Sequence, residues 1–340
     1  MTSLALTASA AGREPRWISL PVLPEGLAGQ FAGVHQDQLI VAGGSLFRVP
    51  SWSGGQREWA AKAYLLAQPD GAWREHGLPF ALAHGATVSH PQGMLLIGGS
   101  DPSGHQKRCW WLRAEGGSLR VEPAPELPVP LAYCGAALVG ETAYVFGGQN
   151  SPAATRAESV LYSLNPQQQG ASWKAERAFP GAGRIYATVA SAGGKLYVAG
   201  GASLSANADG KPQRTYLRDA WCYEPHLGWR ALPGLPLLSC AAPSLGVGDR
   251  FAVFGGSDGS LDARVGELRE RHPGFPRTIQ VFSPGRNAWD TPGKVPFSLV
   301  AATATEWRGL AVIPGGEDRP SHRSRAVWAT AIKEFPDARE

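Results

Sequence analysis

A loop near the C-terminus carries side chains that could perform acid–base chemistry. It follows a Gly-Gly pair and reads Glu317-Asp318-Arg319-Pro320-Ser321-His322-Arg323, so an arginine stands six residues after a carboxylate. A carboxylate within hydrogen-bond reach of a hydroxyl can act as a general base. A guanidinium is a preferred bidentate partner for the carboxylate of a substrate. The same residue types also form solvated ion pairs, so their meaning depends on the elements that position the loop.

Six Gly-Gly pairs, each at the end of a short apolar strand, define a repeat. The intervals between their first glycines are 55, 49, 53, 55 and 60 residues. A proline precedes the second glycine by 20 residues in five repeats and by 21 in the fourth. An outer strand before the proline carries tryptophan in five repeats, at Trp17, Trp73, Trp173, Trp229 and Trp289. This pattern predicts an all-β fold, a six-bladed β-propeller of the kelch type.

The phase of the repeat predicts how the ring closes. The chain enters with an outer strand at Trp17 and leaves with a third strand over residues 325–332. We therefore expect the N-terminal strand to complete the last blade, which would remove exposed sheet edges. We expect one propeller domain over residues 15–340, preceded by a disordered tail or signal remnant over residues 1–14. The longest insertion, residues 257–277, is interpreted as either a lid or a solvated turn.

Composition argues against several classes of function. The net charge is only +4 and the basic residues are scattered, so nucleic acid is not an expected partner. No apolar stretch approaches the roughly 20 residues that a membrane span needs, so no membrane association is expected. The four cysteines have neither CxxC nor metal-ligand spacing and are predicted to be buried free thiols: Cys109, Cys134, Cys222 and Cys240.

The C-terminal loop resembles that of the N-acetylneuraminate epimerases, the sialic acid mutarotases. In that family a Gly-Glu is followed after five residues by arginine, with proline three after the glutamate, and Glu317, Pro320 and Arg323 match in register. Residues 183–188, which include Arg184, resemble another segment of the family. The blade order is rotated relative to the usual one, so the chain resembles a cyclically permuted branch. Where a second Gly-Arg segment is usual, this chain has Leu82-Ala83-His84-Gly85.

The resemblance implies an isomerase of carbohydrate metabolism that interconverts the α and β anomers of N-acetylneuraminate, or of a related sugar acid, by ring opening. It implies Glu317 as the catalytic base and Arg323, Arg184 and His84 as substrate-binding residues, without metal or cofactor. The expected partner is a small sugar acid, and the expected state is a monomer or weak homodimer. The family suggests a periplasmic location, but the signal peptide is incomplete, which leaves the cytoplasm open. The alternative function is a non-catalytic kelch propeller that binds a glycan or protein on its loop face.

Overall fold

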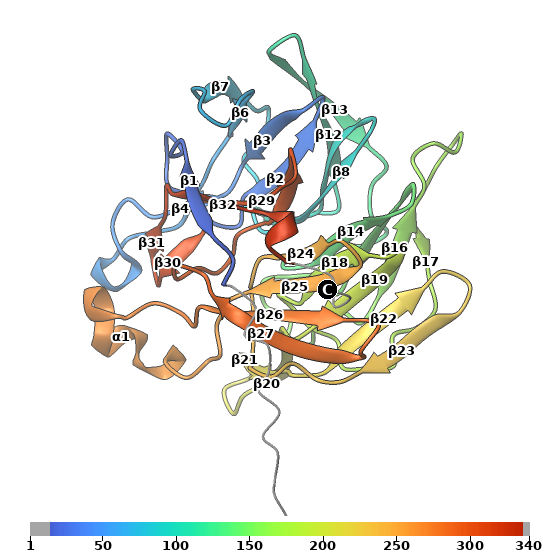
Figure 1. Ribbon diagram of the computed structural model, residues 1–340. Coiled ribbons are helices and arrows are strands. Elements are labelled where there is room, and N and C mark those ends of the chain that lie inside the picture. The colour runs from blue at the N-terminus through green and yellow to red at the C-terminus, as the bar shows by residue number, and fades with distance from the viewer. Residues whose placement is uncertain (1–13, 336–340) are drawn as a thin grey trace, which may run out of the picture.

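The computed structural model describes residues 14–335 as a ring of six antiparallel four-stranded sheets (Figure 1). Of the tail expected over residues 1–14, all but residue 14 lies outside the described residues. The strands of blades 1 to 3 are β2 (Phe31–His35), β3 (Gln38–Ala42), β6 (Lys62–Leu66), β7 (Arg74–Gly77); β8 (Ala86–His90), β9 (Gly93–Ile97), β12 (Cys109–Glu115), β13 (Ser118–Ala124); and β14 (Gly135–Val139), β15 (Thr142–Phe146), β16 (Leu161–Leu164), β17 (Lys174–Ala175). Those of blades 4 to 6 are β18 (Thr188–Ala192), β19 (Lys195–Ala199), β22 (Ala220–Glu224), β23 (Gly228–Leu232); β24 (Ser244–Val247), β25 (Arg250–Phe254), β26 (Thr278–Ser283), β27 (Ala288–Lys294); and β28 (Thr305–Trp307), β29 (Leu310–Pro314), β32 (Val327–Ala331), β1 (Trp17–Leu20).

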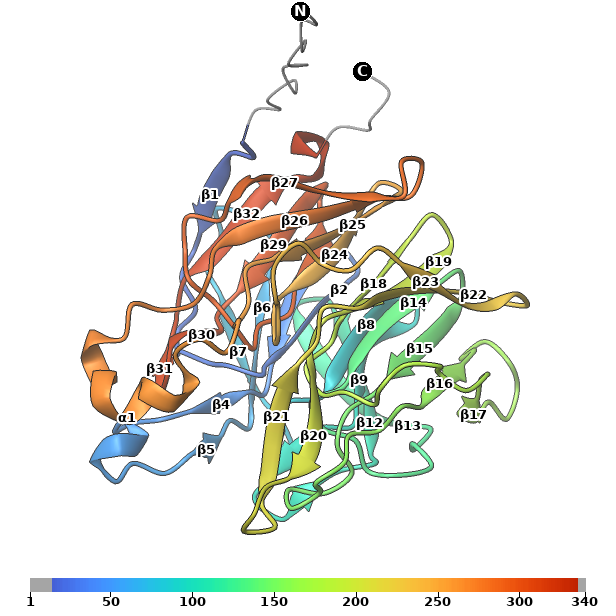
Figure 2. The ribbon, with the colours of Figure 1, turned by 90° about the horizontal axis from the view of Figure 1, so that it is seen from below.

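The two ends of the chain build the sixth blade together, which confirms the predicted closure. Strand β1 pairs antiparallel with β32, with Trp17 opposite Thr330 and Leu20 opposite Val327. The indole of Trp17 packs edge-on against Phe254 of blade 5, with ring centroids 5.7 Å apart. The first and last described strands therefore hold the ring closed (Figure 2).

The Gly-Gly pairs join neighbouring blades. All twelve glycines have φ between 57° and 112°, a backbone conformation that residues other than glycine adopt only at a cost in free energy. The N–H of Gly44 donates to the carbonyl of Leu82 in the next blade at 2.8 Å, and Gly316 makes the same bond to Leu27 at 2.7 Å. A Cβ on Gly43 would lie 2.2 Å from the oxygen of Leu82. The repeat is thus held in register by a close backbone approach that only glycine allows.

Tryptophans in the outer strands of blades 1, 3, 4 and 5 tie each of these blades to the one before it. The indole N–H of Trp73 donates to the carbonyl of Pro21 at 2.8 Å, that of Trp173 to Pro125 at 2.9 Å, and that of Trp289 to Pro233 at 2.7 Å. In the blades of these three tryptophans the ring covers the outer end of the inter-blade core while its indole N–H is satisfied. This explains why the tryptophan recurs with the repeat.

The cysteines are free thiols, as predicted, and three of them are fully buried, Cys134 being partly so. Burial raises the pKa of each thiol, to about 12 for Cys109, Cys134 and Cys240 and to about 11 for Cys222. They are packing residues rather than nucleophiles. None of the helices within residues 14–335 has the length and apolar character needed to cross a membrane.

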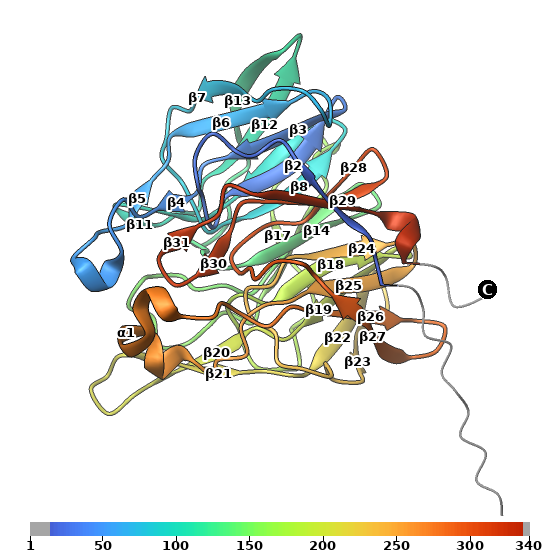
Figure 3. The ribbon, with the colours of Figure 1, turned by 60° about the vertical axis from the view of Figure 1, so that its left-hand side comes forward.

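The segments that follow the Gly-Gly pairs gather on one face of the ring (Figures 2 and 3). Four of them form two-stranded ribbons, namely β4 (Ser45–Leu46) with β5 (Glu58–Trp59), β10 (Ser100–Asp101) with β11 (Gly104–His105), β20 (Ala202–Ala206) with β21 (Pro212–Tyr216), and β30 (Glu317–Arg319) with β31 (His322–Arg323). The insertion at 257–277 carries three short helices, η2 (Asp262–Arg264), α1 (Val265–Leu268) and η3 (Arg269–Arg271). This face, called the loop face below, surrounds one mouth of the central channel.

Candidate active site

A closed ring of backbone hydrogen bonds encircles the mouth of the channel on the loop face. One residue of each blade contributes, and its N–H donates to the carbonyl of the corresponding residue in the preceding blade at 2.7–3.0 Å. All six residues have left-handed φ angles, between 51° and 64°. These ring residues are Gly29, His84, Tyr133, Tyr186, Ala241 and Ala301. A left-handed conformation costs a residue with a Cβ about 1 kcal/mol or more, so the shared hydrogen bonds must hold five of the six in place.

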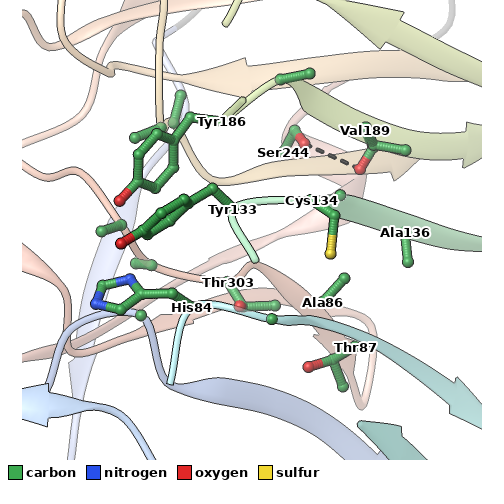
Figure 4. A pocket seen from close by; sticks show the side chains of 18 of the residues that line it. His84, Ala86, Thr87, Tyr133, Cys134, Ala136, Tyr186, Val189, Ser244 and Thr303 are labelled. Atoms are coloured by element: carbon green, nitrogen blue, oxygen red, sulfur yellow. Dashed lines mark hydrogen bonds between the residues drawn. The ribbon is translucent and has the colours of Figure 1, made fainter. Parts of the chain in front are cut away.

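The side chains of the ring residues make the mouth asymmetric. Blades 2 to 4 contribute His84, Tyr133 and Tyr186, whose ring centroids are 5.3 Å and 4.7 Å apart in succession. Blades 5, 6 and 1 contribute two alanines and a glycine, which leaves their side open. Figure 4 shows the three rings side by side, with their polar atoms turned away from Cys134 and Ala136, which line the channel more deeply. The channel below is a cavity of about 130 Å³ with mostly small lining residues.

Glu317 lies on the open half of the mouth. The residue after each Gly-Gly pair forms a backbone bridge to the residue before a ring residue, and Glu317 bridges Val300, next to Ala301. The equivalent positions in the other blades are Ser45, Ser100, Gln149, Ala202 and Ser257, so this is the one carboxylate among the six. Blade 6 stands opposite blade 3 in a six-membered ring, which places the carboxylate across the mouth from Tyr133.

Glu317 and Arg323 form a tight pair within the hairpin β30–β31. Oε2 of Glu317 is ion-paired with Nη1 of Arg323, and Oε1 accepts the N–H of Ser321 at 3.0 Å. The Arg323 side chain is 5% exposed and that of Glu317 is 20% exposed. Burial lowers the pKa of the Arg323 guanidinium from its ordinary value, while the charge of Glu317 acts in the opposite sense. The hairpin thus presents a fixed and partly exposed carboxylate.

A second arginine lies beside this pair. The guanidinium of Arg323 is 4.9 Å from the ring centroid of Phe47, and that of Arg57 is 5.9 Å from the same centroid. Both Phe47 and Arg57 belong to the long segment of blade 1 that follows Gly44. Cations favour the face of an aromatic ring, so one phenyl ring positions both arginines.

His84 is a buried, neutral imidazole at the edge of the site. Its pKa is lowered well below the ordinary value, first by burial and then by the positive charges of Arg57 and Arg323. The hydroxyl of Ser45 donates to the carbonyl of Ala28 at 3.2 Å, so Nε2 of His84 donates to that hydroxyl at 3.0 Å. Nδ1 is then a buried acceptor with no hydrogen-bond partner in the described structure.

Tyr186 is the second ring residue with a shifted pKa. Burial raises the pKa of its hydroxyl, which therefore stays protonated and can donate a hydrogen bond. Arg214 of β21 lies over the ring of Tyr186, with its guanidinium 5.5 Å from the centroid. The arc formed by His84, Tyr133 and Tyr186 thus offers flat apolar surface together with neutral polar atoms.

Arg184 is not at the mouth, in contrast to its expected role in substrate binding. Its side chain is fully buried, and its Nη1 and Nη2 donate to the two carboxylate oxygens of Asp219 at 2.9 and 2.7 Å. Nη1 and Nε also bind the carbonyls of Gly200 and Ala182. A buried arginine with this many partners has no reason to exchange them for a ligand. We therefore do not carry Arg184 into the proposed site.

Contacts between loops of different blades surround the mouth. Ser51 and Ser321 are joined by their hydroxyls at 2.7 Å, and the indole of Trp52 donates to Glu270 at 3.0 Å. The segment 257–277 is therefore connected to the loop of blade 1 rather than free in solvent. Its His272 is buried, and burial lowers the pKa of that imidazole, while the charge of Glu317 acts to raise it.

The sequence indicated Glu317 and Arg323, whereas Arg57, Tyr133 and Tyr186 were not among the predicted site residues. A usable signal existed for the ring residues, because each stands 14 positions before the first glycine of its pair, as with 29 and 43. No such signal existed for Arg57, which lies in an irregular loop. Among residues 14–335, no group of three or more His, Cys, Asp or Glu side chains is arranged to hold a metal ion.

The fold and the site together define a class: a kelch-type six-bladed propeller with a carboxylate–arginine pair and an aromatic arc at one mouth. Comparison with solved structures supports the fold, because the structure of YjhT aligns with a TM-score of 0.68 over 91% of this chain and 95% of that chain, at 15% sequence identity. No protein-family model matches the chain.

Curated sequences confirm the resemblance to the N-acetylneuraminate epimerases. The chain is 29% identical over 231 residues to the N-acetylneuraminate epimerase of Haemophilus influenzae strain 86-028NP, and the aligned region covers 61% of this chain and 59% of that protein. It is 28% identical over 235 residues to that of Yersinia enterocolitica serotype O:8, covering 61% and 57%. A shorter match to that of Brucella suis has 34% identity over 110 residues, or 29% and 28% of the two chains. The first two matches thus span less than two thirds of these relatives.

Proposed function

We propose that this protein is an isomerase that interconverts the α and β anomers of N-acetylneuraminate or a closely related sugar acid. The observation that carries the proposal is the Glu317–Arg323 pair, which occupies the open half of the channel mouth in a loop that matches the epimerase motif. The similarity to curated N-acetylneuraminate epimerases supports the choice of substrate.

The reaction needs a base and an acid on the two sides of the anomeric carbon. Glu317 removes the proton of the anomeric hydroxyl, whose oxygen forms a carbonyl with the anomeric carbon. The bond to the ring oxygen breaks, and the ring oxygen keeps the electron pair and takes a proton from a neutral donor. Rotation about the bond next to the carbonyl, followed by the reverse steps, closes the ring on the other face. A positioned base of this kind contributes a factor of about 10² to 10⁴.

The remaining residues have roles that follow from their positions. Arg323 orients the carboxylate of Glu317 and borders the substrate. The candidates for the proton donor are the hydroxyls of Tyr133 and Tyr186 on the aromatic arc, whereas His84, whose Nδ1 is an unpaired acceptor, would accept a hydrogen bond from a substrate hydroxyl. No step of this reaction calls for a metal or a redox cofactor.

A rotated blade order accounts for the limited sequence coverage. If the chain starts at a different blade from its relatives, a collinear alignment can follow only the blades that remain in the same order. The matches over 61% of this chain agree with this expectation. We therefore extend the proposal to a cyclically permuted relative of these epimerases.

Proton NMR tests the proposal directly. Sialidase releases N-acetylneuraminate as the α anomer, and the decay of its signals toward the equilibrium mixture is followed with and without the protein. We expect a catalytic acceleration that scales with protein concentration. If the decay is unchanged while the sugar acid still binds, the non-catalytic propeller is the better description, and if neither occurs the substrate assignment is wrong.

A further inference from the structure

Beside the Glu317–Arg323 pair lies an arginine, Arg57, that no acidic group neutralises among the described residues. Arg323 is paired with Glu317, and Arg48 on the same loop as Arg57 is paired with Glu58 at 2.9 Å. Arg57 has neither an ion pair nor a hydrogen-bond acceptor among the described residues, and its Nε is buried without a partner. An unpaired buried donor is uncommon in folded proteins and calls for an explanation.

Arg57 is close to the groups that the proposed reaction uses. It shares the ring of Phe47 with Arg323, and its charge is one cause of the lowered pKa of both Arg323 and His84, after burial in each case. It also acts on Tyr186, whose pKa it lowers against the larger effect of burial. The guanidinium is therefore near the carboxylate–arginine pair on one side and the aromatic arc on the other.

The substrate class places a strict demand on this position. In a 2-keto sugar acid the anomeric carbon carries both the hydroxyl that Glu317 would deprotonate and the carboxylate. The carboxylate must therefore be held within a few ångströms of Glu317 without facing an uncompensated like charge. Arg323 is already neutralised by Glu317, and neutral His84 adds no charge. The four residues Glu317, Arg323, His84 and Arg57 together carry one net positive charge, which matches a monoanion.

We infer that Arg57 binds the carboxylate of the substrate. The inference rests on the proposed function and names the cation that recognises its substrate class. The planar fork of arginine suits a carboxylate, and lysine supplies the charge without the fork. Arg57 thus selects sugar acids over neutral sugars, while Glu317 performs the proton transfer.

The test uses a ligand that cannot react. The β-methyl glycoside of N-acetylneuraminate keeps the carboxylate but cannot open its ring, and its methyl ester lacks the negative charge. Dissociation constants of both are measured by calorimetry or saturation-transfer NMR for the wild type and for Arg57→Ala, Arg57→Lys and Arg48→Ala. The last is the matched control, because it removes one charge from the same loop at a side chain that is 67% exposed and paired with Glu58. Thermal melting verifies that each variant is folded.

We expect the wild type and Arg48→Ala to prefer the acid to the ester. Arg57→Ala should weaken binding of the acid about 10- to 100-fold, abolish the preference, and raise KM for mutarotation with a much smaller change in kcat. The affinity of Arg57→Lys for the acid should lie between those of the wild type and Arg57→Ala. An Arg57→Ala variant that keeps the acid preference would overturn the inference, as would a wild type that does not bind the glycoside. If Arg57→Ala loses binding but the wild type shows no mutarotation, the inference stands and the proposed reaction is the part that fails.

Discussion

Replacing Glu317 by glutamine separates the proposed base from its structural contacts. The two side chains have the same shape, so the amide oxygen can still accept the N–H of Ser321, which lies 3.0 Å from Oε1 in the structure. The interaction with Arg323 loses its charge, because an amide cannot form an ion pair. An amide also cannot remove a proton from a hydroxyl.

The cost in stability can be worked out from exposure. Unpairing a fully buried ion pair costs about 3–5 kcal/mol, whereas an exposed pair contributes less than about 1 kcal/mol. Arg323 is 5% exposed but Glu317 is 20% exposed, so we expect a loss of about 1–2 kcal/mol in the free energy of unfolding. Domains are typically stable by about 5–15 kcal/mol, so the variant should remain folded.

The effect on rate should be much larger than the effect on stability. Loss of a general base corresponds to a factor of at least about 10², which would bring the observed rate close to the uncatalysed one. The assay is the NMR time course of the α anomer, with circular dichroism melting of the same samples. Asp318→Asn is the control, since that neighbouring carboxylate instead faces His322 at 2.7 Å. A Glu317→Gln enzyme with wild-type kcat would refute the assignment of Glu317 as the base.

Three further predictions concern the ring and its closure. Deleting residues 1–20 removes β1 and the burial of Trp17 and Leu20, so we expect at least about 3 kcal/mol of destabilisation by urea unfolding, and unchanged melting would contradict the closure. Because the pKa of His84 is held below its ordinary 6.5, the unfolded chain binds a proton that the folded chain does not. Stability should therefore fall as the pH drops below about 6.5, by at most about 1.4 kcal/mol per pH unit for this group, and His84→Gln should show a shallower decline between pH 7.5 and 5. Gly29→Ala would place a Cβ 2.2 Å from Nδ1 of His84 at a φ of 64°, so its melting temperature should fall, whereas Ala301→Gly at the equivalent ring position, with a φ of 51°, should be neutral or stabilising.

The fold was predictable from the sequence because its determinants are local and repeated. Each Gly-Gly pair marks a backbone position that needs positive φ and a close approach to the next blade, and six such marks at nearly constant spacing define the blades. The strand at Trp17 precedes the first pair and a third strand ends the last unit, so the ring could close only by joining them. The Glu317–Arg323 pair was predictable for the same reason, because both residues lie on one short hairpin.

Only the tertiary structure decided which side chains from different blades meet. Arg184 and Asp219 are 35 residues apart, and their pairing inside blade 4 removed an arginine that the sequence placed at the mouth. Arg57 lies next to Arg323 because both loops converge on Phe47 once β1 and β32 have closed the ring. The sequence could determine the repeat because strand register and turn geometry are set by neighbouring residues. The composition of the mouth depended on loop conformations and long-range charge pairing, which have no periodic signature.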